Sequence, residues 1–182
     1  QTIGAINTIH KKEGLLIGDN TDSIGFLSAV QNSKIPWLTR PIYILGAGGA
    51  AKAICYALQT VGVNSIFVWN RTPARLKSLS SLMKTIQPWE IKAPLPYNAI
   101  VIQCTPLGQQ GEDPLSMQEW TSEHIVYDLI YRETPLLKQV LSAGGTAING
   151  VGMLIHQAAH SFARWFECPP PIMSMTQHFS HL

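Results

Sequence analysis

The sequence predicts an α/β fold in which helices flank a doubly wound parallel sheet, and two observations support this prediction. From Pro41 onward, short apolar runs of strand length alternate with amphipathic stretches of helical period. A glycine-rich turn joins the first of these runs to the first of these helices. Strands that alternate with helices pair in parallel through right-handed crossovers, so one sheet should hold all the strands.

The elements of this sheet follow one another regularly, and together they place one domain at residues 40–150. We expect its strands at residues 42–45, 65–69, 99–104, 125–130 and 146–149. We expect its helices at residues 50–60, from 73 into the mid-80s, and 134–142.

The segment before this domain has a different pattern. Residues 2–9 and 14–18 predict two short strands around a turn at residues 10–14, where Gly14 supplies the turn. A helix should follow, with Thr21 or Asp22 as its N-cap, and end at Asn32 and Ser33.

The segment after the domain contains one further helix, at residues 153–166, that no strand follows. This helix is therefore free to pack elsewhere. The run Cys168-Pro169-Pro170-Pro171 should stop it. The last residues, with His178 and His181, should form a surface tail.

Composition excludes several classes of protein. Of the chain's 182 residues, 46% are hydrophobic and 13% charged, a composition that favours a packed globular protein. Its net charge of +2 is too small to indicate affinity for nucleic acid or a membrane surface. The three cysteines form no Cys-x-x-Cys pattern. No apolar run approaches the roughly 18 residues of a membrane span, and the first residues of the sequence have no signal-peptide h-region. We expect a soluble cytoplasmic protein. Because the chain opens on Gln1 and enters a strand-like run at once, we also expect truncation or processing.

The strongest local motif is Gly46-Ala47-Gly48-Gly49-Ala50-Ala51, which follows a strand and opens a helix. It matches the G-x-G-x-x-G/A pattern of dinucleotide-binding Rossmann domains, in which the glycines allow a tight turn and the helix N-terminus binds the pyrophosphate. The alternative is a glycine turn that only joins a strand to a helix.

The end of the second strand indicates which dinucleotide would bind. Asn70, Arg71, Thr72 and Arg75 stand where an NAD site usually has a carboxylate for the ribose hydroxyls. Two arginines one helical turn apart suit the 2′-phosphate of NADP. The alternative is that both arginines are solvated surface charges.

A second polar group lies before the sheet, in Asn7-Thr8 and Gly18-Asp19-Asn20-Thr21-Asp22. Its carboxylates and amides could bind a polyol or position a proton-transfer group, although a helix N-cap explains Thr21 and Asp22 equally well. His156 and His160 are four residues apart but lack a third ligand, so we predict no metal site.

Five motifs in this order resemble the shikimate dehydrogenase family, which includes quinate/shikimate relatives. The resemblance covers nearly the whole chain. The motifs are Gly4-Ala5-Ile6-Asn7-Thr8, Gly18-Asp19-Asn20-Thr21-Asp22, Gly46-Ala47-Gly48-Gly49-Ala50, Asn70-Arg71-Thr72 with Arg75, and Gly150-Val151-Gly152-Met153-Leu154 with Gln157-Ala158-Ala159.

The resemblance implies a role for each matched residue. Asn7 and Asp22 would hold substrate hydroxyls, and Asp22 would be the catalytic carboxylate, working with a lysine. Tyr131 and Gln157 would be further substrate contacts, although a strand-end aromatic and a solvated helix residue are the plain alternatives. The nicotinamide of the cofactor would be lined by Thr105, Leu129, Gly150 and Met153.

The resemblance also implies a reaction and a domain organisation. The reaction is hydride transfer between NADPH and 3-dehydroshikimate to give shikimate, in aromatic amino-acid and chorismate biosynthesis. Residues 1–32 would be the end of a substrate-binding domain with its linking helix, and residues 151–182 a helix packing back toward it, plus a tail. The assembly would be a monomer or a homodimer.

Two departures from the family stand out. The family's Ser-x-Ser motif and catalytic lysine are absent, and Lys11 and Lys12 lie on the wrong side of Asn7, on the predicted turn, to replace that lysine. Ser23 stands where the family usually has glycine. We therefore expect this chain to bind NADP but to turn over shikimate poorly or not at all. The alternatives are a quinate-oxidising relative that uses NAD, or a non-catalytic ligand-sensing module.

Overall fold

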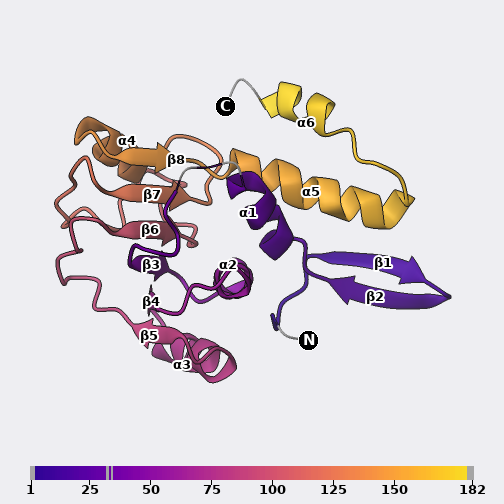
Figure 1. The fold of residues 1–182 in the computed structure, drawn as a ribbon, viewed down its shortest axis with the longest axis horizontal. Helices are drawn as coiled ribbons and strands as arrows, with labels where there is room; N and C mark the ends of the chain where they lie inside the picture. Colours follow the sequence, from indigo (N-terminus) through magenta and orange to yellow (C-terminus); the bar gives the residue numbers. More distant parts are fainter. Residues whose placement is uncertain (1–2, 32, 34, 180–182) are drawn as a thin grey trace.

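A six-stranded parallel sheet forms the body of the protein; it contains the five predicted strands and one more (Figure 1). The structure, a computed structural model, describes residues 3–31, 33 and 35–179. The strand order is β5-β4-β3-β6-β7-β8, in which the chain runs outward from β3 to one edge and then returns to fill the other. The strands are β3 (Ile42–Leu45), β4 (Ile66–Trp69), β5 (Ile86–Pro88), β6 (Ile100–Gln103), β7 (Ile125–Asp128) and β8 (Thr146–Ile148).

Alternate residues of the strands build a separate core on each face of the sheet, because successive side chains of a strand point to opposite faces. Ile42 and Ile44 of β3 pack on one face, under α1 (Asp22–Val30), α2 (Gly49–Thr60), α3 (Pro73–Leu82) and α5 (Val151–Phe166). Leu45 packs on the other face, under α4 (Pro135–Ser142) and two long loops. The strand order runs outward from β3 in both directions, and helices cover both faces, so the sheet is doubly wound.

A two-stranded antiparallel hairpin projects from this body (Figure 1). Its strands are β1 (Thr8–Lys12) and β2 (Leu15–Asp19), so the predicted strand at residues 2–9 and the predicted turn at 10–14 are wrong. The turn needs only Glu13 and Gly14, with φ of 50° and 82°, because two residues of positive φ match the twist of the strands. Lys11 and Lys12 therefore lie in β1 and not in the turn. Residue 2, the first of the predicted strand, lies outside the described residues.

The helices α1 and α5 cross in close contact between the sheet and the hairpin (Figure 1). Gly25 allows this approach, because a Cβ atom there would lie 2.7 Å from Cβ and backbone N of Gln157. The predicted helix that follows the hairpin is confirmed as α1. Thr21 is its N-cap residue, one of the two predicted, but the Thr21 side chain makes no capping hydrogen bond. Asn20 Oδ1 accepts the backbone N–H of Asp22 instead, at 3.0 Å.

Two elements differ from the sequence prediction near the ends of the sheet and the chain. The strand β5 was not predicted, and α3 ends at Leu82, short of the mid-80s, because the chain must turn there to enter β5. The predicted tail contains a helix, α6 (Ile172–Phe179), since prolines are well tolerated at a helix start. His178 belongs to this helix, and His181 lies outside the described residues. No helix in the described part of the chain is long and apolar enough to span a membrane.

Candidate functional site

The glycine-rich turn between β3 and α2 begins at a position whose backbone conformation and close neighbours only glycine fits. Gly46 has φ of 109°, and its N–H donates to the carbonyl of Trp69 at 2.7 Å. A Cβ atom there would lie 3.2 Å from Cγ2 of Thr105 and 3.3 Å from the backbone of Cys104. The turn is thus packed directly against the end of β6, which brings Thr105 beside it.

The next residues of the turn leave space for an anion. A Cβ atom on Gly48 would meet nothing within 4 Å. Gly48 is the N-cap of α2 and no side chain caps this helix, so its first N–H groups can bind phosphate oxygens. A cavity of about 180 Å³ opens here, lined by Ala47, Gly48, Gly49, Lys52, Arg75 and Ser78.

Asn70 supports the turn with its side chain. Its Oδ1 accepts the N–H of Ala47 at 3.1 Å, and its Nδ2 donates to the carbonyl of Thr72 at 2.9 Å. The side chain therefore joins the turn after β3 to the loop after β4. The sequence predicts only cofactor binding for Asn70, and the structure adds this bridge between two loops.

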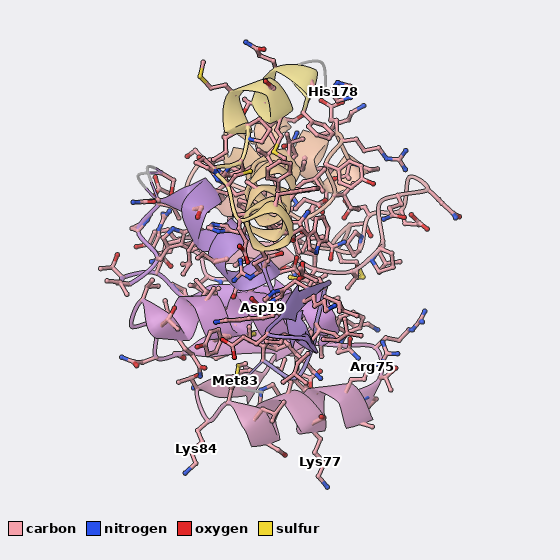
Figure 2. All side chains as sticks on the ribbon, turned by 90° about the vertical axis from the view of Figure 1, so that its right-hand side faces the viewer. Asp19, Arg75, Lys77, Met83, Lys84 and His178 are labelled. Carbon is pink, nitrogen blue, oxygen red and sulfur yellow. The ribbon has the colours of Figure 1, made fainter. Side chains whose placement is uncertain are left out.

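Two arginines bring positive charge to this cavity: Arg75 lines it, and Arg71 lies one helical turn earlier in the sequence. Both arginines are exposed, and so is Thr72. Arg75 projects from the first turn of α3, whereas Lys77 points away from the body of the molecule (Figure 2). Among the described residues, no carboxylate lies within ion-pair distance of Arg71 or Arg75. Both charges remain available to a phosphate group.

A second group of polar side chains gathers where the hairpin meets α1 and α5. Asn7 Nδ2 lies 2.7 Å from Oδ1 of Asp22 and 3.5 Å from Oε1 of Gln157. Asn7 precedes β1, Asp22 opens α1, and Gln157 lies on α5, where Gly25 admits it. The structure thus brings together three residues that are up to 150 positions apart in the sequence.

The electrostatics of this cluster centre on Asp22. Burial raises the pKa of Asp22, and the hydrogen bond from Asn7 opposes that rise. Only Oδ1 of Asp22 has a hydrogen-bond partner among the described residues. Its Oδ2 can therefore accept a hydroxyl proton from a bound molecule.

The ends of β6 and β7 form a third group, which buried Gln103 organises. Its Oε1 accepts the N–H and the hydroxyl of Thr105, both at 2.9 Å, and its backbone carbonyl accepts the N–H of Leu129 at 3.0 Å. Gly150 fits closely beside this edge, because a Cβ atom there would lie 2.1 Å from the carbonyl oxygen of Leu129. Met153 is buried in the first turns of α5.

Tyr131 is a predicted substrate contact whose side chain makes no hydrogen bond within the described part of the chain. Its side chain is half exposed. No hydrogen bond therefore links it to Asn7, Asp22 or Gln157 among the described residues. Within the described part of the chain there is also no group of three potential metal ligands, and His160 faces Ser28 at 3.3 Å.

Sequence reasoning missed two residues that support the site from behind. Gln103 and Ser161 are buried polar residues, and each bonds to a predicted site residue or its neighbour. Thr8, which the second polar group already included, is also buried and lies 3.1 Å from Oδ1 of Asn7. Ser161 lies one helical turn after Gln157, a spacing that could have indicated it.

Asp19 takes no part in the cluster, although it belongs to the same motif as Asp22. It pairs with Arg164 of α5, and Figure 2 shows it on the hairpin. Burial raises the pKa of Asp19, but the hydrogen bonds from Arg164 and Asn20 outweigh this effect and lower it overall. The indole N–H of Trp165 donates to the carbonyl of Ile9 at 2.9 Å. Together these contacts fasten α5 to the hairpin.

Two family models match the chain. The model described as shikimate / quinate 5-dehydrogenase matches residues 29–112, and the model described as shikimate 5′-dehydrogenase C-terminal domain matches residues 150–178. A curated relative named shikimate dehydrogenase (NADP(+)), from Bacillus cereus, is 38% identical over 96% of this chain and 68% of its own length. The chain spans 63 to 68% of the length of the curated relatives it matches.

Solved structures agree with these matches. Shikimate 5-dehydrogenase from Thermus thermophilus, in complex with NADP(H) and shikimate, is 31% identical with a TM-score of 0.83, over 99% of this chain and 69% of that one. Quinate dehydrogenase from Corynebacterium glutamicum, in complex with NAD, is 26% identical with a TM-score of 0.80, over 100% of this chain and 69% of that one. The chain belongs to the shikimate dehydrogenase family.

Proposed function

We propose that the intact protein is an NADP-dependent oxidoreductase that interconverts 3-dehydroshikimate and shikimate. The observation that supports this most directly is the cluster of Asn7, Asp22 and Gln157, which offers a carboxylate and two amides to a polyol. The family membership and the basic cavity at the glycine-rich turn support it further.

In this proposal Asp22 is the catalytic carboxylate. Its Oδ2 accepts the proton of the substrate hydroxyl that is oxidised, while Asn7 holds Oδ1 in place. Asn7 and Gln157 bind neighbouring hydroxyls, and Tyr131 provides a further contact when substrate is bound. Burial of Asp22 favours this role, because a raised pKa makes the carboxylate a better base.

The cofactor site fits the shape and charge of NADP. Gly46, Ala47, Gly48, Gly49 and Ala50 would hold the pyrophosphate at the start of α2. The 2′-phosphate would be held by Arg71 and Arg75, with Asn70 and Thr72 shaping the ribose pocket. The nicotinamide would be lined by Thr105, Leu129, Gly150 and Met153. When bound, the cofactor supplies the hydride chemistry.

The proposal extends to the organisation of the protein. Residues 1–32 and 151–182 would belong to the substrate side of the molecule, and residues 40–150 to the cofactor side. The protein would be cytoplasmic and a monomer or homodimer, with shikimate and 3-dehydroshikimate as its small-molecule partners. A quinate-oxidising enzyme that uses NAD is less favoured, since Arg71 stands where a carboxylate would be expected.

Calorimetric titration with NADP and NAD tests the cofactor assignment. We expect NADP to bind well ahead of NAD. Arg75→Gln should raise the Kd for NADP about tenfold or more, because it removes a charge-assisted hydrogen bond to phosphate, and leave the Kd for NAD unchanged. Lys77→Gln, on the same helix but pointing away, is the matched control and should change neither. Equal affinity for both dinucleotides, or no binding of either, would contradict the assignment.

A further inference from the structure

Three buried hydroxyl groups lie behind the Asn7 carboxamide. Thr8, Thr21 and Ser161 are 2%, 0% and 4% exposed. The Ser161 Oγ lies 2.6 Å from Oγ1 of Thr8 and 3.0 Å from Oγ1 of Thr21. These residues come from β1, from the turn before α1 and from α5, so the hydroxyl cluster joins three elements at one point.

Two groups, one that can only donate and one that can only accept, decide which atom of the Asn7 amide is the oxygen and which is the nitrogen. The backbone N–H of Thr21 can only donate, and it lies 2.9 Å from Oδ1 of Asn7. The Asp22 carboxylate can only accept when ionised, and it lies 2.7 Å from Nδ2. The hydroxyls of Thr8 and Thr21 also lie within reach of Oδ1, at 3.1 and 3.2 Å.

Ser161 decides how these hydroxyls are arranged. Its own proton has an acceptor in the backbone carbonyl of Gln157, at 3.1 Å. With that bond formed, Oγ has both lone pairs free to accept from Thr8 and Thr21. Without Oγ, both buried threonine protons would need other acceptors, and those within reach are the side-chain oxygens of Asn7 and Gln157.

We propose that Ser161 is a positioning residue for substrate binding. By accepting the hydroxyl protons of Thr8 and Thr21, it leaves Oγ1 of Thr21 to accept from Nδ2 of Asn7, at 3.0 Å, and so keeps the amide turned toward Asp22 and the substrate. The inference rests on the proposed function. It adds to the site a residue whose side chain is itself buried and whose link to the Asn7 side chain runs through Thr8 and Thr21.

The test is a comparison of variants in the intact protein, measured as KM and kcat for each substrate. Ser161→Ala should raise the KM for shikimate about five- to tenfold, as expected for one buried hydrogen bond, and leave the KM for NADP unchanged. Thr8→Val removes a second member of the cluster and should have the same selective effect. Ser28→Ala is the matched control, because Ser28 bonds to His160 in the same α1–α5 interface without touching Asn7.

The side-chain amide signal of Asn7 in an NMR spectrum gives a readout independent of turnover. We expect it to shift in Ser161→Ala and Thr8→Val but not in Ser28→Ala. If the KM for shikimate and the Asn7 signal stay unchanged in both variants, Ser161 only holds the helices together and the inference is overturned. If the wild-type protein does not oxidise shikimate, the proposed function fails, and the Asn7 signal still decides whether Ser161 orients the amide.

Discussion

Gly25 determines how closely α1 and α5 pack, and Gly25→Ala tests whether this packing sets the geometry of the site. The added Cβ would lie 2.7 Å from both Cβ and N of Gln157 and 2.8 Å from its Cα. Two of these atoms are backbone, so no change of rotamer can relieve the contact. The helices must separate by about 0.7 Å to bring this 2.7 Å approach to an ordinary contact of about 3.4 Å.

The magnitude follows from two opposing effects. Alanine is the better helix former by about 1 kcal/mol, which favours the variant. Overpacking of a buried contact costs about 1–3 kcal/mol, and the rigid backbone places this case at the upper end. We expect the free energy of unfolding to fall by about 1–2 kcal/mol, and the Tm by about 2–8 °C.

Chemical and thermal unfolding of the 182-residue chain measure this change. Gly152→Ala is the control in the same interface, because its Cβ would meet only Ala29, at 3.4 Å, and we expect unchanged or higher stability. In the intact protein Gly25→Ala should also raise the KM for shikimate, because it moves Gln157 away from Asp22. A Gly25→Ala variant as stable as the wild type would refute the packing argument.

Three other predictions follow from the charges and thiols. In a pH–rate profile, the low-pH limb of kcat/KM should lie above the ordinary pKa of an aspartate, because burial raises the pKa of Asp22. Asn7→Ala should move this limb to still higher pH, because it removes the hydrogen bond that opposes the rise. Arg164→Ala should lower stability at pH 7 by less than about 1 kcal/mol, since the pair with Asp19 is partly exposed. Because the folded-state pKa of Asp19 is lowered, this difference should vanish as the pH falls through that pKa, and unfolding at pH 7 and about pH 2 checks it. A thiol reagent at neutral pH should modify the exposed Cys168 rapidly and leave Cys55 unreacted in the folded chain, because burial raises the pKa of Cys55 to about 12.

The sheet was predictable because its signals are local. Each strand of the sheet except β5 is a short apolar run. The turn at Gly46 is recognisable from its glycines and from its position between a strand and a helix. β5 was missed because it has only three residues, one of them Pro88. The hairpin register was missed because Glu13 adopts a positive φ that its residue type does not suggest.

The candidate site was predictable only in part, because its geometry depends on contacts between distant residues. The family motifs indicated Asn7, Asp22 and Gln157, and the structure places them together. No local pattern could show that Ser161 would meet Thr8 across 153 positions. No local pattern could show either that Asn70 would bond to the backbone of Ala47.

The measurement that tests the central claim most directly is shikimate-dependent formation of NADPH by the intact protein, in the wild type and in Asp22→Asn. We expect the wild type to reduce NADP with shikimate. Asp22→Asn should lose about 10²- to 10⁴-fold in kcat, because an amide cannot accept the hydroxyl proton, while its affinity for NADP is retained. A wild type that binds NADP but does not oxidise shikimate, or an Asp22→Asn variant with undiminished turnover, would contradict the account.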